Sequence, residues 1–263
     1  MITSLRQRNT WDLIWQLFRS DFKMKYNDSI LGFIWVLTKP FAIFTIMYFV
    51  VSQVFRFGDI ENFPLYLLLG NMFISFWTEG TTLGMGSLLN RQNLITKVSF
   101  PRYIVLVSST FLALINFIIN ISVFLLISLG AGILPNITQL AWFLSIVIVF
   151  YFLILITSMI LSVLYVRFRD MLHIWELINQ LLFWTTPVFY PISLVAENSR
   201  LLEIFLTIIN PISVLLTAAR NAIIYGELTS GFIIASWLLL MLIIGAIGYF
   251  YYKSSIKRVA EFF

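Results

Sequence analysis

Few residues of this chain could do chemistry, and two of them lie inside apolar stretches. Glu79 falls near the middle of the apolar stretch 64–89, and Lys39 lies in the stretch 31–55, one residue before Pro40. An ionisable group inside a membrane is costly and by default indicates a functional site. The alternative for Glu79 is a protonated or hydrogen-bonded carboxyl at a helix interface. Lys39 either snorkels to the cytoplasmic surface or makes a contact in a channel or between subunits.

The sequence motifs of common catalytic sites are missing. There is no G-x-x-x-x-G-K-[ST] phosphate loop, no G-x-S-x-G, no H-E-x-x-H and no C-x-x-C. The chain has no cysteine and one histidine, His173, which excludes a thiolate or histidine metal cluster within one chain. We therefore expect no catalytic residue, metal or cofactor in this chain. If ATP drives its work, the ATPase is another polypeptide.

Composition indicates an integral membrane protein. Of 263 residues, 60% are hydrophobic and only 11% are charged, whereas a soluble protein carries about 25% charged residues. The net charge of +5 could indicate nucleic-acid binding, but in so apolar a chain we attribute it to basic cytoplasmic loops and expect no nucleic acid. The first ten residues do not read as a signal peptide, because no short apolar core with a cleavage site follows them.

Hydrophobic patterning predicts an all-α membrane domain in residues 1–263, with six spans. Each apolar run is long enough to cross a bilayer or nearly so. Before the first span, residues 9–26 carry aromatic side chains on one helical face and charges on the other, which is typical of a helix lying in the membrane interface; a helix packed on a soluble partner is the alternative. Gly80 and Gly84 have the spacing that lets helices approach closely. The predicted spans are 31–55, 64–89, 103–129, 140–166, 174–190 and 232–252.

The sequence pattern of residues 191–230 predicts a segment that enters the membrane from the outer face and returns to the same face. Asn210-Pro211 breaks its apolar run, and Arg220 follows too soon for a clean span. With six spans, thirteen lysines and arginines fall on one side and three on the other, leaving out Lys39; basic loops are cytoplasmic, so both termini should be too. The thirteen are Arg6, Arg8, Arg19, Lys23, Lys25, Arg91, Lys97, Arg102, Arg167, Arg169, Lys253, Lys257 and Arg258, and the three are Arg56, Arg200 and Arg220.

Four stretches in register resemble one protein family. They are YNDSILGFIWVLTKP (26–40), NLITKVSFPR (93–102), RFRD (167–170) with the following span and its TTPVFYP ending (185–191), and INPIS (209–213). Together they are similar to the permease subunit of ABC exporters that move lipid-linked polysaccharides such as O antigens, capsules and teichoic acids. Lys39 and Glu79 depart from the family's pattern, which leaves the charge of the pathway open.

The resemblance implies a bacterial cytoplasmic-membrane complex. Two copies of this chain would form the pathway for a lipid-linked glycan among membrane lipids, with two copies of a separate ATPase that binds ATP and Mg²⁺. The interfacial helix and the loop after the second span would receive the ATPase movement. The coupling residues in that loop would be Arg91, Asn93, Lys97, Phe100, Pro101 and Arg102.

Two further groups of residues are candidates for contact with the substrate. Arg167, Arg169 and Asp170 form a short turn that is either only solvated or the lip of the pathway, where an arginine grips the lipid phosphate and Asp170 holds the arginine between cycles. Aromatic rings stack on sugars, although most aromatic residues of such a chain face lipid or pack helices. The candidate pathway aromatics are Phe73, Phe76, Trp77, Phe183, Trp184, Phe189 and Tyr190.

Three other functions compete with this interpretation. A drug or lipid exporter of a related ABC branch shares the mechanism. A secondary transporter that needs no ATPase would be expected to show inverted repeats and several intramembrane charges. A membrane enzyme acting on lipid-linked sugars would need clustered acids or histidines. Asp170, His173 and Glu176 are a candidate for such a cluster.

Overall fold

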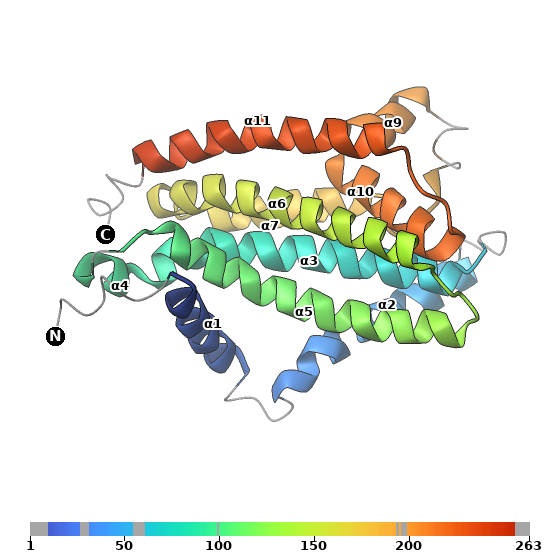
Figure 1. Ribbon diagram of the computed structural model, residues 1–263, viewed down its shortest axis with the longest axis horizontal. Helices are drawn as coiled ribbons and strands as arrows, with labels where there is room; N and C mark the ends of the chain where they lie inside the picture. Colours follow the sequence, from blue (N-terminus) through green and yellow to red (C-terminus); the bar gives the residue numbers. More distant parts are fainter. Residues whose placement is uncertain are drawn as a thin grey trace.

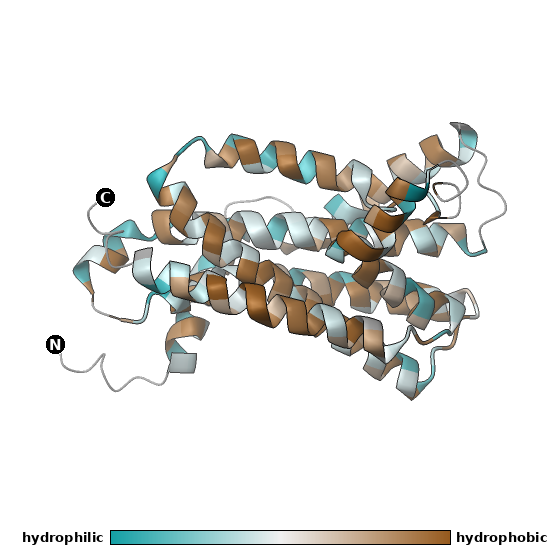
Figure 2. Cartoon of the chain, turned by 90° about the horizontal axis from the view of Figure 1, so that it is seen from above, coloured by the Kyte–Doolittle hydropathy of each residue, from teal (hydrophilic) through white to brown (hydrophobic). Residues whose placement is uncertain are grey.

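The fold is a bundle of helices. The computed structural model describes residues 10–26, 32–54, 61–98, 100–192, 195 and 199–255, and every regular element within them is helical, so the prediction of an all-α fold is confirmed. Apolar residues dominate the middle of the bundle, and hydrophilic residues gather in the turns at its ends (Figure 2). Outside the described residues lie Asn9, Phe55, Asn198 and the basic residues Arg6, Arg8, Arg56, Lys257 and Arg258.

The long helices run side by side along one axis, as Figure 1 shows. In chain order the elements are α1 (Thr10–Tyr26), the 3-10 turn η2 (Gly32–Ile34), α2 (Trp35–Val54), α3 (Phe63–Asn90), α4 (Gln92–Lys97), α5 (Tyr103–Gly130), α6 (Ile137–Arg167), α7 (Met171–Thr185), α9 (Arg200–Ile204), the π-helical turn η3 (Phe205–Ile209), α10 (Pro211–Arg220), a second π-helical turn η4 (Asn221–Tyr225) and α11 (Gly231–Ser255).

Helix α3 is the centre of the bundle, packed against α5 and α6 with most of its residues buried. Two glycines allow α6 to come close. A Cβ atom at Gly80 would lie 2.7 Å from Ile154 Cγ2, and one at Gly84 would lie 2.2 Å from Ser158 Oγ. The prediction that these glycines serve close helix packing is therefore confirmed.

Four helical segments of the described residues are long and apolar enough to cross a membrane: Gly32–Gln53, Tyr103–Gly130, Ile137–Arg167 and Ile234–Ser254. They make the chain an α-helical membrane protein. Two helices expected to be spans are outside this set. The 28 residues of α3 are long enough, but Asn71 and Glu79 lower its hydropathy. The 15 residues of α7 rise only about 22 Å, short of the ~30 Å hydrocarbon core.

Two helix boundaries differ from the predicted ones for local chemical reasons. Helix α7 ends at Thr185 rather than at Tyr190, because Pro187 cannot continue a helix. Helix α6 begins at Ile137 rather than at residue 140. A capping box starts it, in which Asn136 Oδ1 accepts from Gln139 N at 2.9 Å and Gln139 Oε1 accepts from Asn136 N at 2.6 Å.

The segment around Asn210 is a broken helix pair, as its sequence predicts. Arg200–Ile209 and Pro211–Tyr225 meet at an angle of 79°. Asn210 begins the second half, since its Oδ1 accepts from Ile212 N at 3.0 Å and from Ser213 N at 3.3 Å. This pair lies at the end of the bundle opposite to α4 and to the two described ends of the chain (Figure 1).

Helix α1 lies oblique to the bundle and packs on α5 (Figure 1). Its buried face consists of Ile14, Leu17, Phe18 and Tyr26. Near the start of the helix, Trp11 is 69% exposed. A helix with one face packed on protein and a large exposed aromatic residue is suited to a membrane surface.

Candidate functional site

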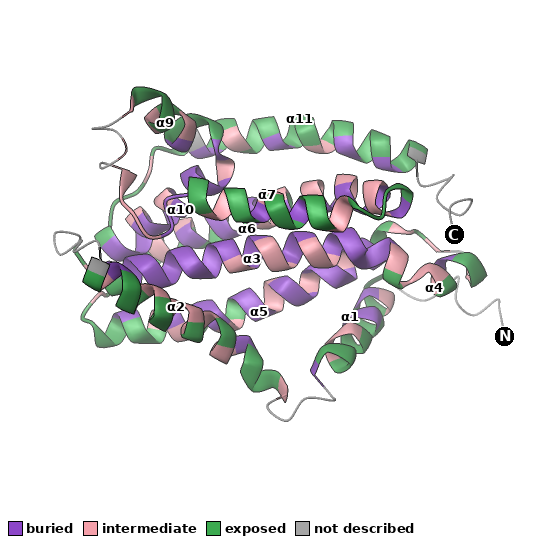
Figure 3. Cartoon of the chain, turned by 180° about the vertical axis from the view of Figure 1, so that it is seen from behind, coloured by how far each residue is buried: buried purple, intermediate pink, exposed green. Residues whose placement is uncertain are grey.

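A cleft of about 710 Å³ is lined by residues of α1, α2, α3, α5 and α7. Figure 3 shows the side of the bundle on which α3 lies between α2 and α7. Polar side chains of α3 follow the cleft at helical spacing, so they share one face. Lys39 from α2 and Glu79 from α3, the two charges singled out in the sequence, both line it. The other polar lining residues include Asn71, Ser75, Thr78 and Thr82 on α3, Asn116 and Asn120 on α5, and Glu176, Asn179 and Gln180 on α7.

Glu79 has a charged partner that sequence reasoning missed. Lys25, at the end of α1, forms an ion pair with the Glu79 carboxylate. Asn116 Nδ2 donates to Glu79 Oε1 at 2.7 Å and also lies 3.0 Å from the Tyr26 hydroxyl oxygen. Burial would lower the pKa of Lys25, but the Glu79 carboxylate outweighs burial and the pKa is raised above 10.5. Lys25 is therefore charged at neutral pH.

Asparagine side chains supply donors where the backbone of α2 is irregular. Pro40 has no N–H, so the carbonyl of Val36 lacks its usual partner within the helix. Asn120 Nδ2 donates to that oxygen at 3.2 Å, and Asn71 Nδ2 donates to the Pro40 carbonyl at 2.9 Å. Asn116 and Asn120 thus bond to neighbouring elements, as their spacing predicts.

Lys39 remains a single cation on the cleft wall. The side chain is exposed, and none of the ion pairs formed within the described ranges includes it. The structure thus places Lys39 on the wall of the cleft.

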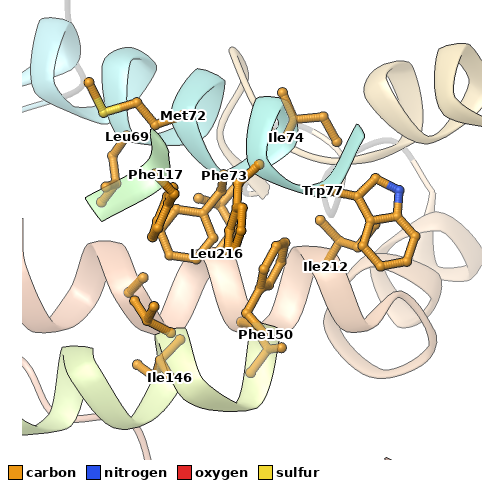
Figure 4. Close-up of a cluster of buried hydrophobic side chains, with 14 of the residues drawn as sticks. Leu69, Met72, Phe73, Ile74, Trp77, Phe117, Ile146, Phe150, Ile212 and Leu216 are labelled. Atoms are coloured by element: carbon orange, nitrogen blue, oxygen red, sulfur yellow. The ribbon is translucent and has the colours of Figure 1, made fainter. Parts of the chain in front are cut away.

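The candidate pathway aromatics divide into two groups. Phe73, Phe76 and Trp77 are 0%, 2% and 4% exposed and pack in the core with Phe117 and Phe150. Figure 4 shows Phe73 and Trp77 in this cluster. That placement favours a packing role, although Phe76 also borders the cleft. The second group surrounds the end of α7, where neighbouring ring centroids are 5.1–6.1 Å apart. It consists of Phe183, which lines the cleft, with Trp184, Phe189 and Tyr190.

Arg220 is a functional candidate that the sequence reading did not single out. It is 1% exposed, and its guanidinium lies 3.4 Å from the centroid of the Tyr66 ring. It donates to the carbonyls of Tyr66 at 2.9 Å, Pro187 at 2.6 Å and Val188 at 2.8 Å. One arginine from α10 therefore bonds the irregular backbone after α7 and the first turns of α3. Such backbone inside a membrane needs protein partners.

Gly70 and Asn210 complete this group of contacts around Arg220, which we call the Arg220 clamp. A Cβ atom at Gly70 would lie 2.3 Å from Arg220 Nη2. Asn210 Nδ2 donates to Thr186 Oγ1 at 3.1 Å, which ties the break before α10 to the break after α7. In the sequence, an arginine shortly after an Asn-Pro break indicates this site only weakly, because nothing local in the sequence indicates partners so far away along the chain.

The predicted coupling residues lie around α4 and are not equivalent. Arg91 is used inside the chain, where it forms an ion pair with Asp21 of α1 and donates to the Leu17 carbonyl at 3.1 Å. Phe100 packs against the apolar cluster beneath α1. Asn93, Lys97 and Pro101 are exposed, and Arg102 is half-buried.

Arg167, Arg169 and Asp170 are all exposed in the turn between α6 and α7, at the same end of the bundle as α4 (Figure 1). The Arg167 guanidinium lies 5.2 Å from the centroid of the Phe168 ring. Within the described ranges, no ion pair joins Asp170 to either arginine. The turn is open to a ligand from the membrane surface.

Comparison with known proteins supports the exporter interpretation. No model of a known protein family matches the chain. The chain is 28% identical over 213 residues to the O-antigen export system permease protein RfbA of Myxococcus xanthus, covering 81% of this chain and 80% of that protein. Two proteins of the same name from Klebsiella pneumoniae are 26% and 25% identical, each covering 85% of this chain and 84% of the relative. The resemblance to ABC polysaccharide-exporter permeases is therefore confirmed: along most of its length, this chain is similar to O-antigen export permeases.

Proposed function

We propose that this chain is the membrane-spanning subunit of an ATP-driven exporter that moves lipid-linked polysaccharide across the bacterial cytoplasmic membrane. The observation that carries the proposal is the similarity to O-antigen export permeases, which extends over 81–85% of the chain. The cleft supports it, because its wall combines amide and hydroxyl groups with aromatic rings. Such a wall suits a glycan that slides without tight binding.

The topology we propose has six spans, with α3 and α7 added to the four apolar segments. Polar residues of α3 can lie inside a membrane when they face other helices or a cleft rather than lipid. The irregular residues after Thr185 extend α7, and the Arg220 clamp provides their hydrogen bonds. The broken pair around Asn210 then enters from the outer face, and both termini are cytoplasmic with α4.

The complex we propose contains two copies of this chain and two copies of a separate ATPase subunit. That partner binds ATP and Mg²⁺, and it contacts α1 and the exposed residues of the α4 loop. At the same end, Arg167 or Arg169 meets the lipid phosphate as the substrate arrives. Arginine suits this role, because its planar fork bonds two phosphate oxygens at once.

The proposal is tested by reconstitution. The chain is purified with its ATPase and placed in vesicles that contain the lipid-linked glycan of the source cells. ATP should move glycan to the face opposite the ATPase, and an ATPase variant unable to hydrolyse ATP should not move it. Glycan transport that does not depend on ATP would favour a secondary transporter, and no transport by an active, assembled complex would refute the proposal.

A further inference from the structure

Two ion pairs hold helix α1 against the rest of the bundle, and we call their positions the first and the second level. At the first level Asp21 pairs with Arg91 and lies 3.4 Å from Ser109 Oγ of α5. At the second level Lys25 pairs with Glu79, while Asn116 of α5 donates to the same carboxylate. In addition, Phe18 of α1 packs edge-on against Phe111 of α5, with ring centroids 5.4 Å apart. A movement of α1 therefore acts on both α3 and α5.

The two levels differ in their environment. The side chains of Arg91 and Asp21 are 13% and 16% exposed, as in a structural ion pair. Lys25 and Glu79 are 37% and 29% exposed, and both line the cleft. Glu79 is the only carboxylate that the described part of α3 presents to the cleft, whose other charged lining residues are Lys39 of α2 and Glu176 of α7. Lys25 is the cation paired with Glu79, so it decides whether the wall beside Glu79 is neutral or negative.

We propose that Lys25 is a specificity-determining residue, because α1 carries it into the cleft as the counter-ion that hides the charge of Glu79 from an anionic substrate. The inference rests on the proposed function, in which the substrate carries a lipid phosphate. With α1 docked, the wall is neutral at this level and a phosphate can pass. If α1 withdraws, the free carboxylate of Glu79 repels the phosphate through a medium of low dielectric constant. The position of α1 thereby controls which charge the cleft accepts.

The test uses neutral variants in the reconstituted complex. Lys25→Met leaves the carboxylate bare and should lower glycan export at least about fivefold, the lower end of measured couplings between sites. Glu79→Gln removes the charge but keeps an oxygen that can accept from Asn116, so this variant should export more glycan than Lys25→Met. The double variant should recover the level of Glu79→Gln, because no bare carboxylate remains.

Recovery in the double variant separates this role from a structural one. If the pair only held the fold together, the double variant would export no better than Lys25→Met, and the proposal would be overturned. Full export by Lys25→Met would overturn it too. Lys253→Met makes the same change at an exposed position of α11, outside the cleft and the proposed ATPase contact, and should export normally. Failure of the wild-type complex to export would instead refute the proposed function.

Discussion

At the residue scale, polar side chains of this protein lie where the backbone is irregular. Asn120 bonds the Val36 carbonyl that Pro40 leaves without a partner, and Arg220 bonds the carbonyls of Pro187 and Val188. Each donor comes from another helix, so each irregular segment is also a point where helices are joined. Buried polar groups are costly without partners, and these contacts explain how prolines can lie within the apolar stretches.

The Arg220 clamp should be sensitive to volume at Gly70. Gly70→Ala would place a Cβ atom 2.8 Å from the Val188 carbonyl oxygen and closer still to the guanidinium. Overpacking of this kind costs roughly 1–3 kcal/mol, so the midpoint of thermal unfolding in detergent should fall by several degrees. Gly130→Ala is the control, because no atom lies within 4 Å of the Cβ position there. Equal midpoints of thermal unfolding for the two variants would show that the Arg220 clamp can accommodate the added methyl group, and would contradict this prediction.

The arginines between α6 and α7 give a second prediction at this scale. Changing Arg167 and Arg169 together to lysine keeps the charge but removes the planar fork. Since charged hydrogen bonds contribute roughly 1.5–3 kcal/mol, glycan export should fall at least about fivefold while ATP hydrolysis by the complex continues. Normal export by the double lysine variant would leave this turn with a role in topology only.

At the element scale, α1 and α4 form one unit at the end of the bundle where the ATPase is proposed to bind. Arg91 lies at the junction of α3 and α4 and pairs with Asp21, so the two elements are linked by charge. Phe100 adds an apolar contact to the cluster that contains Ile14 and Leu17. A force applied at α4 therefore reaches α1 through contacts within this chain.

Lys97 is the residue of α4 best placed to contact a partner, because it is exposed. Lys97→Glu should weaken binding of the ATPase by about tenfold or more, since a like-charge contact across an interface costs at least the 1.4 kcal/mol that corresponds to this factor. The measurement is the affinity of the purified subunits for each other. Lys253→Glu reverses a charge at the same end of the bundle outside the loop and should bind normally. Equal affinities would place the ATPase contact elsewhere.

The elements themselves could be predicted from the sequence, but the contacts between them could not. Long apolar runs with helical spacing indicate α2, α3, α5, α6 and α11 within a few residues, and Asn210-Pro211 indicates the broken pair. Lys25 lies 54 residues from its partner Glu79 along the chain, and Tyr66 lies 154 residues from its partner Arg220. No local pattern encodes such pairings, because they depend on how the helices pack. Aromatic composition alone likewise does not distinguish a core from a pathway, and the structure buries Phe73 and Trp77 in the core.

At the scale of the whole molecule, the two ends of the bundle have different chemistry. The end with α4 carries the exposed charges of Lys97, Arg167 and Arg169, whereas the opposite end contains the broken helix pair (Figure 1). This asymmetry matches the proposed orientation, in which cytoplasmic loops are basic. It also places the clamp and the proposed ATPase contact at opposite ends of the molecule.

Topology can be tested directly because the chain contains no cysteine. Ser254→Cys should react with a membrane-impermeant thiol reagent only after the cells are opened, and Ser199→Cys should react in intact cells. Both positions lie within the described residues, unlike Asn198. Labelling of residue 254 in intact cells would mean that Arg200–Tyr225 crosses the membrane completely and that the six-span topology is wrong.

The Arg220 clamp also bears on how the protein tolerates acid. Its partners are three carbonyl oxygens and an aromatic ring, none of which takes up a proton in the range of pH that bacteria meet. A clamp built on a carboxylate would lose its attraction as the surroundings acidify, but this one keeps its charge and its partners. The end of the bundle that is proposed to face the outside is therefore expected to keep this set of contacts in an acidic medium.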